Sequence, residues 1–506
     1  MQQNYSLNIG LFTQNITLRR ITILLLLLLG LGIRLLDLTD PPLDIHPTRQ
    51  LHSALMARGM YYQGRTDLPE WQVTTAVRQW KREAVIEPQV MENLTVNLYN
   101  VAGGEFVWIA RILSSLFWVA GGLAIYLLAS QLTNADGGIT ALIFYLFQTY
   151  GVMASRTFQP DPLMVSLICF AWWSFQRWLQ KPDWKWTIIA GLITGAAIYV
   201  KNVSVFFLAI PYIVLIFRKD IKELVKDVRV WVLAIVALLP AVIYTIYGTF
   251  VAGYLGQQFS FRIFPNLWVD ISNYSRWMGQ IKDTAGIPAL ILGLVGIFLF
   301  EAGQSRKWIL GLWLGYAIYG FTFAYHIGTH DYYQLPLIPI LALSIAPLGS
   351  FIISKMLSIH AWKYIRPVLY GLGVVIVLTL LWQNRNILNS QNHRAEPAFW
   401  LSLGDRLRDV SVIGLTEDYG YRMAYYGWDS IDNWPGTGDL AVRKLAGKPE
   451  KEIQTLIEKD IKGKNYFLVT WFEDYARQQE LKTYLEKTYP VETGEGYLLF
   501  DIGHPY

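Results

Sequence analysis

Apolar blocks long enough to cross a membrane as helices recur through most of the chain, from Ile21 to Trp382. The first block, Ile21 to Leu36, contains an unbroken run of leucines. About 20 apolar residues in helical conformation cross the roughly 30 Å hydrocarbon core of a bilayer. A helix also satisfies its own backbone hydrogen bonds there, where no water is available. The sequence therefore predicts a mainly α-helical, polytopic membrane protein.

The hydropathy pattern predicts about eleven spans. Lysine and arginine gather in cytoplasmic loops, and the basic residues of the short loops here all fall on one side of that arrangement. They are Arg19, Arg20, Arg218, Lys219, Lys222, Lys226, Arg229, Arg306, Lys307, Lys355, Lys363 and Arg366. This side, with the N-terminus, is predicted to be cytoplasmic. The spans are predicted at residues 19–36, 105–130, 138–154, 161–179, 186–200, 203–217, 230–247, 287–300, 308–324, 333–350 and 367–384.

Several classes of protein are disfavoured by the composition. No small-residue cleavage site follows the first block, so it is expected to remain as a span rather than be removed as a signal peptide. The net charge is only +5 and no basic run suggests nucleic-acid binding. The single cysteine, Cys169, excludes an internal disulfide and a zinc site built on several cysteines.

Three longer segments are predicted to face outward: the first outer loop at 37–104, a second loop at 248–286, and the C-terminal region. The C-terminal region shows short apolar strands and helical periodicity. We therefore divide the chain into a transmembrane domain, 1–384, and a small extracytoplasmic α/β domain, 385–506. Its predicted strands are 410–415, 466–471 and 496–500, and its predicted helices are 449–462 and 473–487.

The first outer loop carries Asp44 a few residues after a membrane exit. One interpretation is a general base close to a lipid-borne substrate; the other is a carboxylate that interacts with the free N–H groups of a helix start. Pro47 suits the first position of a helix and Gly59 its end. That helix is expected to rest in the membrane interface. One of its faces carries Leu51, Ala54, Leu55 and Arg58, and another carries Arg49, His52 and Met56.

Two outward turns place further charges on the same side. Arg156 and Asp161 lie between the third and fourth spans. They form part of a polar site, a simple ion pair, or a helix cap at Asp161 ahead of Pro162. Lys201 lies between the fifth and sixth spans, and either contributes to an anion site or extends its ammonium group toward water.

The loop before the tenth span reads His330-Asp331-Tyr332-Tyr333 and enters a proline-bearing span. His326 and His330 have the spacing of metal ligands on a helix, but Gly328 lies between them. A metal site is therefore only weakly indicated. The imidazole and phenol groups instead add polar and aromatic surface to the outer side.

Together these motifs resemble those of the GT-C membrane glycosyltransferases, in particular the dolichyl-phosphate-mannose protein mannosyltransferases and aminoarabinose transferases of glycosyltransferase family 39. Asp44 takes the place of the aspartate in the family's Asp-Glu pair, whose glutamate is Ile45 here. The turn with Asp161 is similar to the family's second acidic site. Lys201 occupies the place where these proteins often have a Thr-Lys pair. Tyr332-Tyr333-Gln-Leu-Pro336 resembles the Tyr-Leu-Leu-Pro segment.

This resemblance implies an inverting glycosyltransferase that moves a monosaccharide from a polyprenyl-phosphate carrier to an acceptor hydroxyl. Asp44 would be the base, and Asp161 would position the acceptor or the donor sugar. Glu87-Pro88-Gln89 replaces the family's Lys-Pro-Pro, so phosphate contacts are expected from Arg156, Lys201 or His330. The remaining expected substrate-binding residues are Arg49, Tyr332 and Tyr333.

The resemblance implies no obligatory cofactor; a divalent cation is allowed but not indicated. The partners would be the lipid-linked donor, membrane lipids, and a lipid, polysaccharide or protein acceptor at the outer face of a bacterial plasma membrane. The alternative is a non-enzymatic transporter or lipid-carrier translocase. Such proteins usually have internal repeats and ionisable groups near mid-membrane, whereas the polar residues here lie mainly at span ends. A membrane scaffold is a third alternative.

Overall fold

The structure is a computed structural model that describes residues 10–85, 87–216, 221–255, 262–358, 364–445, 447, 457 and 459–506. The chain forms two compact units. The first consists of Met1–Leu38, Val85–Val90 and Ala110–Gln391, and the second of Thr39–Ala84, Met91–Ile109 and Asn392–Tyr506. The second unit thus combines most of the first outer loop with the C-terminal region, which the division at residue 384 had separated.

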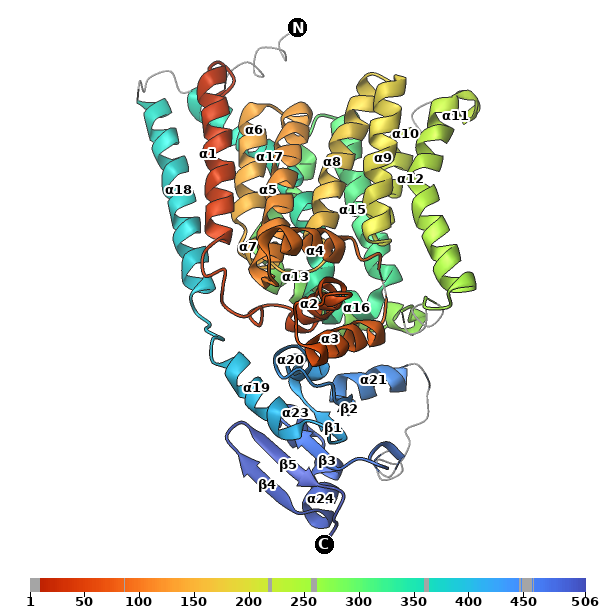
Figure 1. The fold of residues 1–506 in the computed structure, drawn as a ribbon. Helices are drawn as coiled ribbons and strands as arrows, with labels where there is room; N and C mark the ends of the chain where they lie inside the picture. The colour runs from red at the N-terminus through yellow and green to blue at the C-terminus, as the bar shows by residue number, and fades with distance from the viewer. Residues whose placement is uncertain are drawn as a thin grey trace. The chain divides into compact units, whose positions relative to one another are not determined.

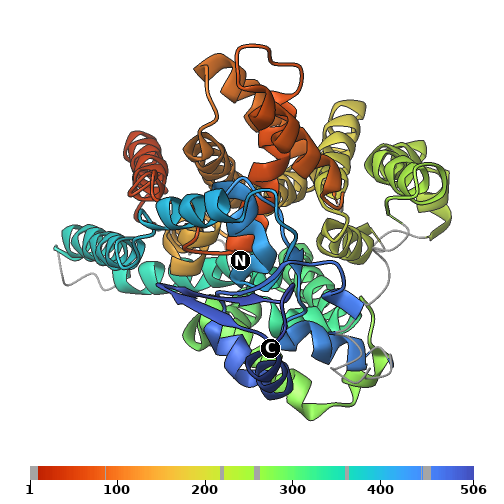
Figure 2. The same ribbon diagram turned by 60° about the horizontal axis from the view of Figure 1, so that its bottom comes forward.

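The first unit is a bundle of helices that run roughly side by side in Figure 1 and are seen nearer to end-on in Figure 2. Each of the predicted span ranges coincides with a helix or, for 138–154, with the pair α6 and α7. The helices are α1 (Ile16–Arg34), α5 (Val107–Leu132), α6 (Ala135–Phe147), α7 (Thr149–Ala154), α8 (Asp161–Gln180), α9 (Trp184–Val200), α10 (Ser204–Ile216), α11 (Ile221–Lys226), α12 (Val228–Ile246), α13 (Ile271–Thr284), α14 (Ile287–Leu299), α15 (Gln304–Thr322), α16 (Ala324–Thr329), α17 (Leu337–Leu357) and α18 (Ile365–Leu388).

Five helical segments within the described residues are long and apolar enough to cross a membrane, and a sixth is counted if the bent pair α13–α14 is one span. Three further apolar helices, α6, α9 and α10, are shorter. These helices are those of an integral membrane protein, while the number of eleven spans stays a prediction. Three of the basic residues used to predict orientation, Arg218, Lys219 and Lys363, lie outside the described residues.

Small residues let helices of the first unit approach closely. A Cβ atom at Gly195 of α9 would stand 2.7 Å from the carbonyl oxygen of Val236 in α12, and one at Gly191 would stand 3.1 Å from the Val236 side chain. Spacing of small residues by four along a helix is a common membrane packing device, because it brings backbones together where the hydrophobic effect cannot.

The second unit contains three helices of the first outer loop: α2 (Pro47–Tyr62), α3 (Glu70–Arg82) and α4 (Val90–Ala102). The expected end of α2 is wrong. The helix does not end at Gly59, where a side chain would collide with Trp80 of α3, but continues to Tyr62. Its expected position in the membrane interface stays a prediction. Leu51, Leu55 and Arg58 are all buried, because α3 and the C-terminal helix α20 (Tyr421–Tyr426) pack against it.

The C-terminal part of the second unit is built on a five-stranded sheet with the order β2-β1-β3-β5-β4. Strand β1 pairs in parallel with β2 and β3, and β5 pairs antiparallel with β3 and β4. The predicted strands are present, and two short ones, β2 and β4, were not predicted. The strands are β1 (Val412–Leu415), β2 (Asp432–Asn433), β3 (Tyr466–Val469), β4 (Val491–Gly494) and β5 (Tyr497–Asp501).

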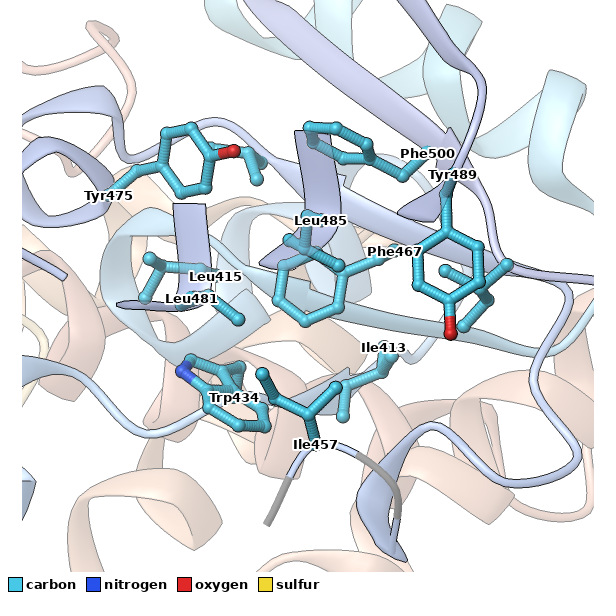
Figure 3. Packing of buried hydrophobic residues seen from close by; sticks show 12 residues of the cluster. Ile413, Leu415, Trp434, Ile457, Phe467, Tyr475, Leu481, Leu485, Tyr489 and Phe500 are labelled. Carbon is cyan, nitrogen blue, oxygen red and sulfur yellow. The ribbon is translucent and has the colours of Figure 1, made fainter. Parts of the chain in front are cut away.

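Both faces of this sheet are covered. Ile413, Phe467 and Phe500 point into a core with Leu481 and Leu485 of α24 (Gln479–Thr488) (Figure 3). The alternate residues of the strands enter a second core with α19 (Glu396–Leu407) and α20. Burial on both faces explains the continuous apolar runs that predicted these strands.

Helix prediction in this region has two outcomes. The predicted helix 473–487 is divided into α23 (Phe472–Arg477) and α24, while 449–462 lies largely outside the described residues.

Candidate functional site

Lys201 and Asp161 form a buried ion pair in the first unit. Helix α8 begins at Asp161 and α9 ends at Val200, so the antiparallel hairpin places both side chains at the same end. Lys201 Nζ donates to both carboxylate oxygens of Asp161, at 2.9 and 3.0 Å. Asp161 is 1% exposed and Lys201 8%. The lysine therefore turns inward to a carboxylate instead of extending along the surface.

Glu87 is a second acidic neighbour of this lysine. Its Oε1 lies 3.4 Å from Lys201 Nζ, and its side chain is the more exposed of the two carboxylates. The sequence shows only that Glu87-Pro88-Gln89 replaces the family's Lys-Pro-Pro. It does not predict the contact between Glu87 and Lys201, because these residues are far apart in the chain. Because one cation faces two carboxylates, the formal charge of the group is negative. Lys201 can offer full positive charge to a phosphate only when a carboxylate releases it.

A row of aromatic rings continues from the ion pair. Lys201 Nζ lies 5.5 Å from the centre of the Tyr332 ring, which is 5.1 Å from Tyr333 and 5.4 Å from His330. Tyr333 stacks on Tyr319 of α15 at 5.6 Å. The short helix η4 (Asp331–Gln334) holds these rings at the start of α17. The structure thus brings together residues predicted from three separate turns: Asp161, Lys201, and the group His330, Tyr332 and Tyr333.

The two histidines of this row stack on each other instead of converging on a metal. The His326 and His330 rings are 5.5 Å apart and nearly parallel, and His330 Nδ1 lies 2.8 Å from Thr329 Oγ1. Burial, followed by His330 and Arg262, lowers the pKa of His326 to about 4, so its imidazole is neutral near pH 7. Among the residues described, no group of three or more histidine, cysteine or acidic side chains is arranged to hold a metal ion.

Arg156, an expected phosphate contact, is buried and contacts the backbone at the entry of the first outer loop. It is 1% exposed, and its Nη2 donates to the carbonyl oxygen of Asp37 at 2.9 Å. Arg111 of α5 donates to the next carbonyl, that of Leu38, at 3.2 Å. Asp37 has a positive φ of 47°. Two buried guanidinium groups therefore fix the strained backbone where the chain leaves α1 and enters the first outer loop.

Asp44 and Arg49 belong to the second unit. The half-buried Asp44 accepts a hydrogen bond from the backbone N–H of Ile45 at 3.1 Å. The N-cap of α2 is His46, which has a left-handed backbone and whose side chain makes no capping hydrogen bond. Arg49 lies in the first turn of α2. Asp44 therefore lies in a turn of unusual backbone conformation, three residues before a buried helix begins.

Sequence reasoning did not find the buried ion pair of the second unit. Arg58 Nε donates to both oxygens of Glu105 at 3.0 Å, and its guanidinium group lies between the rings of Tyr425 and Trp428. Burial alone would lower the pKa of Arg58, but the Glu105 carboxylate outweighs it and holds that pKa above its usual range. Arg58 was expected on the same helix face as Leu51, Ala54 and Leu55. A charged residue on that apolar face was the one sequence feature that could have indicated a buried ion pair.

A second cluster in this unit joins His52 of α2, Glu83 and Tyr421 of α20. The Tyr421 hydroxyl donates to Glu83 Oε2 at 2.7 Å, and His52 Nε2 lies 3.5 Å from the same oxygen. Burial raises the pKa of Glu83, although the Tyr421 hydrogen bond works in the opposite direction. These contacts connect the first outer loop to the C-terminal region, and no local sequence motif indicates them.

Comparison with known proteins is consistent with this architecture. Residues 91–247 match the family model described as dolichyl-phosphate-mannose-protein mannosyltransferase. No curated protein sequence matches the chain. The predicted resemblance is nevertheless confirmed at the level of fold by solved structures.

One similar structure is apo ArnT from Cupriavidus metallidurans, at 13% identity and a TM-score of 0.57, covering 94% of this chain and 97% of that one. ArnT bound to undecaprenyl phosphate gives 14% identity, a TM-score of 0.53, and coverage of 96% and 97%. The archaeal oligosaccharyltransferase AglB from Archaeoglobus fulgidus, in complex with an inhibitory peptide and a dolichol-phosphate, gives 11% identity, a TM-score of 0.56, and coverage of 97% and 74%.

Proposed function

Because the chain has the GT-C fold, we propose that it is an inverting glycosyltransferase that uses a polyprenyl-phosphate monosaccharide as donor. The observation that carries the proposal is the buried Asp161–Lys201 pair at the shared end of the α8–α9 hairpin, with Glu87 and the aromatic row beside it. Two similar solved structures support the proposal, because one shows ArnT bound to undecaprenyl phosphate and the other shows AglB in complex with a dolichol-phosphate. The acceptor is proposed to be a hydroxyl group at the extracytoplasmic face of a bacterial plasma membrane.

The chemistry requires one base and several cations. A phosphate leaving group is already a weak base, so neighbouring positive charge assists its departure more than a proton donor does. The acceptor hydroxyl is a poor nucleophile, and we assign its deprotonation to Asp44. Attack on the face opposite the phosphate inverts the anomeric carbon. One carboxylate suffices for this reaction, unlike the paired carboxylates of glycoside hydrolases.

Lys201 is proposed to bind the donor phosphate by exchanging partners. Its contact with Glu87 is longer than that with Asp161 and more exposed, so it is the contact that a phosphate displaces at lower cost. Asp161 then keeps the ammonium group in place and positions the sugar or the acceptor. Tyr332, Tyr333, His330 and Arg49 are proposed to contact substrate. Arg156 is proposed to contact the donor phosphate as well, and its hydrogen bond to the carbonyl oxygen of Asp37 holds it at the entry of the first outer loop.

The test is donor consumption by purified protein supplied with a panel of polyprenyl-phosphate sugars and envelope acceptors. Wild-type protein should consume one donor, and Asp44→Asn should lose at least about a hundredfold in rate because a general base is removed. Asp67→Asn, at an exposed carboxylate of the same loop, is the matched control and should remain active. Transfer by a folded Asp44→Asn variant at the wild-type rate would refute the assignment of the base.

A further inference from the structure

An aromatic platform lies on the second unit, formed by Tyr62 at the end of α2, Trp71 at the start of α3 and Trp428 after α20. The rings of Trp71 and Trp428 are 5.5 Å apart and nearly perpendicular, and Tyr62 lies 5.8 Å from Trp428. Trp71 is 44% exposed, although tryptophan ordinarily loses most of its surface on folding. Three segments therefore meet in a group of rings in which Trp71 is exposed to solvent and Tyr62 and Trp428 are half-buried.

Contacts with Arg58, which is itself bonded to Glu105, hold the Trp428 ring of the platform in place. The guanidinium group of Arg58 lies 4.2 Å from the centre of the Trp428 ring, and Glu105 fixes Arg58 through two hydrogen bonds. Trp428 has a positive φ of 55°, a conformation that is costly for so large a side chain. Strained backbone at a bulky residue persists only when surrounding contacts enforce it, and such positions cluster at binding sites.

Charged groups of both signs lie beside the rings. Arg408 covers the Trp71 ring at 5.0 Å. Asp429 is close enough to Arg78, Arg408 and Asp409 for each to act on its ionisation, and Asp409 is a second residue with positive φ, at 66°. Asp405 also pairs with Arg408, so the group holds two arginines and three aspartates and has no excess of positive charge. This lack of excess positive charge disfavours a phosphate-rich surface, while the group supplies both donors and acceptors beside the aromatic rings.

We propose that the platform of Tyr62, Trp71 and Trp428 binds a neutral saccharide chain, which is the acceptor of the reaction proposed above. Sugar rings offer apolar C–H faces that pack on indole and phenol rings, and hydroxyl groups that both donate to carboxylates and accept from guanidinium groups. The role of this saccharide as the acceptor rests on the proposed function, whereas its binding to the platform does not.

The length of α2 adds a geometric requirement. Asp44 lies just before the first residue of α2, and Tyr62 is its last residue. The helix has 16 residues, so it spans about 24 Å at 1.5 Å per residue. One sugar cannot reach from the platform to Asp44, whereas a chain of several sugars can. The platform therefore selects oligomeric acceptors over a single sugar.

The experiment uses neutral oligosaccharides of about two to about eight sugars, prepared by partial hydrolysis of envelope polysaccharide from the source cells. Immobilised full-length protein should retain the longer fragments, and Trp71→Ala should weaken retention by about tenfold, as loss of a central aromatic contact does. Trp71→Phe should restore most of the retention. Phe472→Ala removes an equally exposed aromatic residue of the same unit and should leave retention unchanged.

Absence of retention by wild-type protein, or equal retention by wild type and Trp71→Ala, would overturn the proposal. Capture of a polypeptide in place of the sugars would also overturn it. Donor consumption by Asp44→Asn is measured in parallel. If Asp44→Asn is inactive while Trp71→Ala retains saccharides normally, the proposed function stands and the acceptor platform falls.

Discussion

Lys201 Nζ lies 2.9 Å from Asp161 Oδ1, although 40 residues separate the two in the chain. Both side chains are almost completely buried. Isolated charges are very costly in such surroundings, so each of these two groups depends on the other. The pair therefore ties the α8–α9 hairpin together at the end where the proposed chemistry takes place.

Breaking this pair from one side should be more damaging than removing it entirely. Lys201→Met leaves Asp161 buried without its cation, and we expect a loss of about 3 kcal/mol in the free energy of unfolding. The double variant Lys201→Met/Asp161→Asn should lose less than the sum of the single variants. The measurement is a double-mutant cycle by denaturation in detergent. Additive effects would show that the two groups act independently.

The sequence predicts the long apolar helices of the first unit and the main strands, because apolar length and periodicity are local properties. It does not predict the shorter or more polar helices α11, α13 and α16. It also names Asp161 and Lys201 as site candidates from their positions at span ends. It cannot show that they pair with each other, or that Glu87 joins them, because those contacts depend on how the helices pack. The burial of α2 could not be predicted for a similar reason: one of the helices that pack against it, α20, lies more than 350 residues further along the chain.

Glu87→Gln should strengthen binding of a polyprenyl-phosphate donor. The substitution removes the carboxylate that competes with phosphate for Lys201, and a partly exposed pair of this kind contributes about 1 kcal/mol, or roughly fivefold in affinity. Binding of the donor to purified variants measures the effect. The control is Glu301→Gln, at an exposed position of the same unit. Unchanged or weaker donor affinity in Glu87→Gln would argue against Lys201 as the phosphate ligand.

Arg58→Met should destabilise the second unit by about 3 kcal/mol, because Glu105 would keep its hydrogen bond from Tyr425 but lose the cation that neutralises its charge. Arg58→Lys should restore little of the lost stability. A lysine cannot donate in parallel to both Glu105 oxygens while lying between the Tyr425 and Trp428 rings. Arg65→Met removes a surface ion pair with Asp67 and should cost less than about 1 kcal/mol. Limited proteolysis of the C-terminal region ranks the three variants by their susceptibility to cleavage. Equal susceptibility would contradict the assigned role of Arg58.

Glu83 should make the second unit less stable as the pH rises. Burial raises its pKa from the ordinary value of 4.5, so the folded state holds the proton more tightly than the unfolded state does. The resulting stabilisation is complete below about pH 4.5 and is lost as the pH rises through the raised pKa. Glu83→Gln keeps an acceptor for Tyr421 but cannot titrate. Its Tm relative to the unsubstituted protein should therefore increase between pH 4 and pH 8.

The comparison is best made in a His52→Gln background, because histidine ordinarily titrates near neutral pH and His52 lies 3.5 Å from Glu83. In that background the difference in Tm reports Glu83 alone. A difference that stays constant with pH would show that the burial of Glu83 has no effect on its ionisation.

Gly59→Ala should separate α2 from α3. A Cβ atom at this position would stand 2.8 Å from the carbonyl oxygen of Ala76 and would also collide with Trp80, neither of which is the free end of a flexible side chain. The helices must shift, which in a packed interior costs about 1 to 3 kcal/mol. Gly279→Ala provides the contrast, since a Cβ atom there meets nothing within 4 Å and alanine favours a helix by about 1 kcal/mol. Thermal unfolding should therefore show a lower Tm for Gly59→Ala and an equal or higher Tm for Gly279→Ala. If both substitutions raised the Tm, close contact at Gly59 would not be what holds α2 against α3.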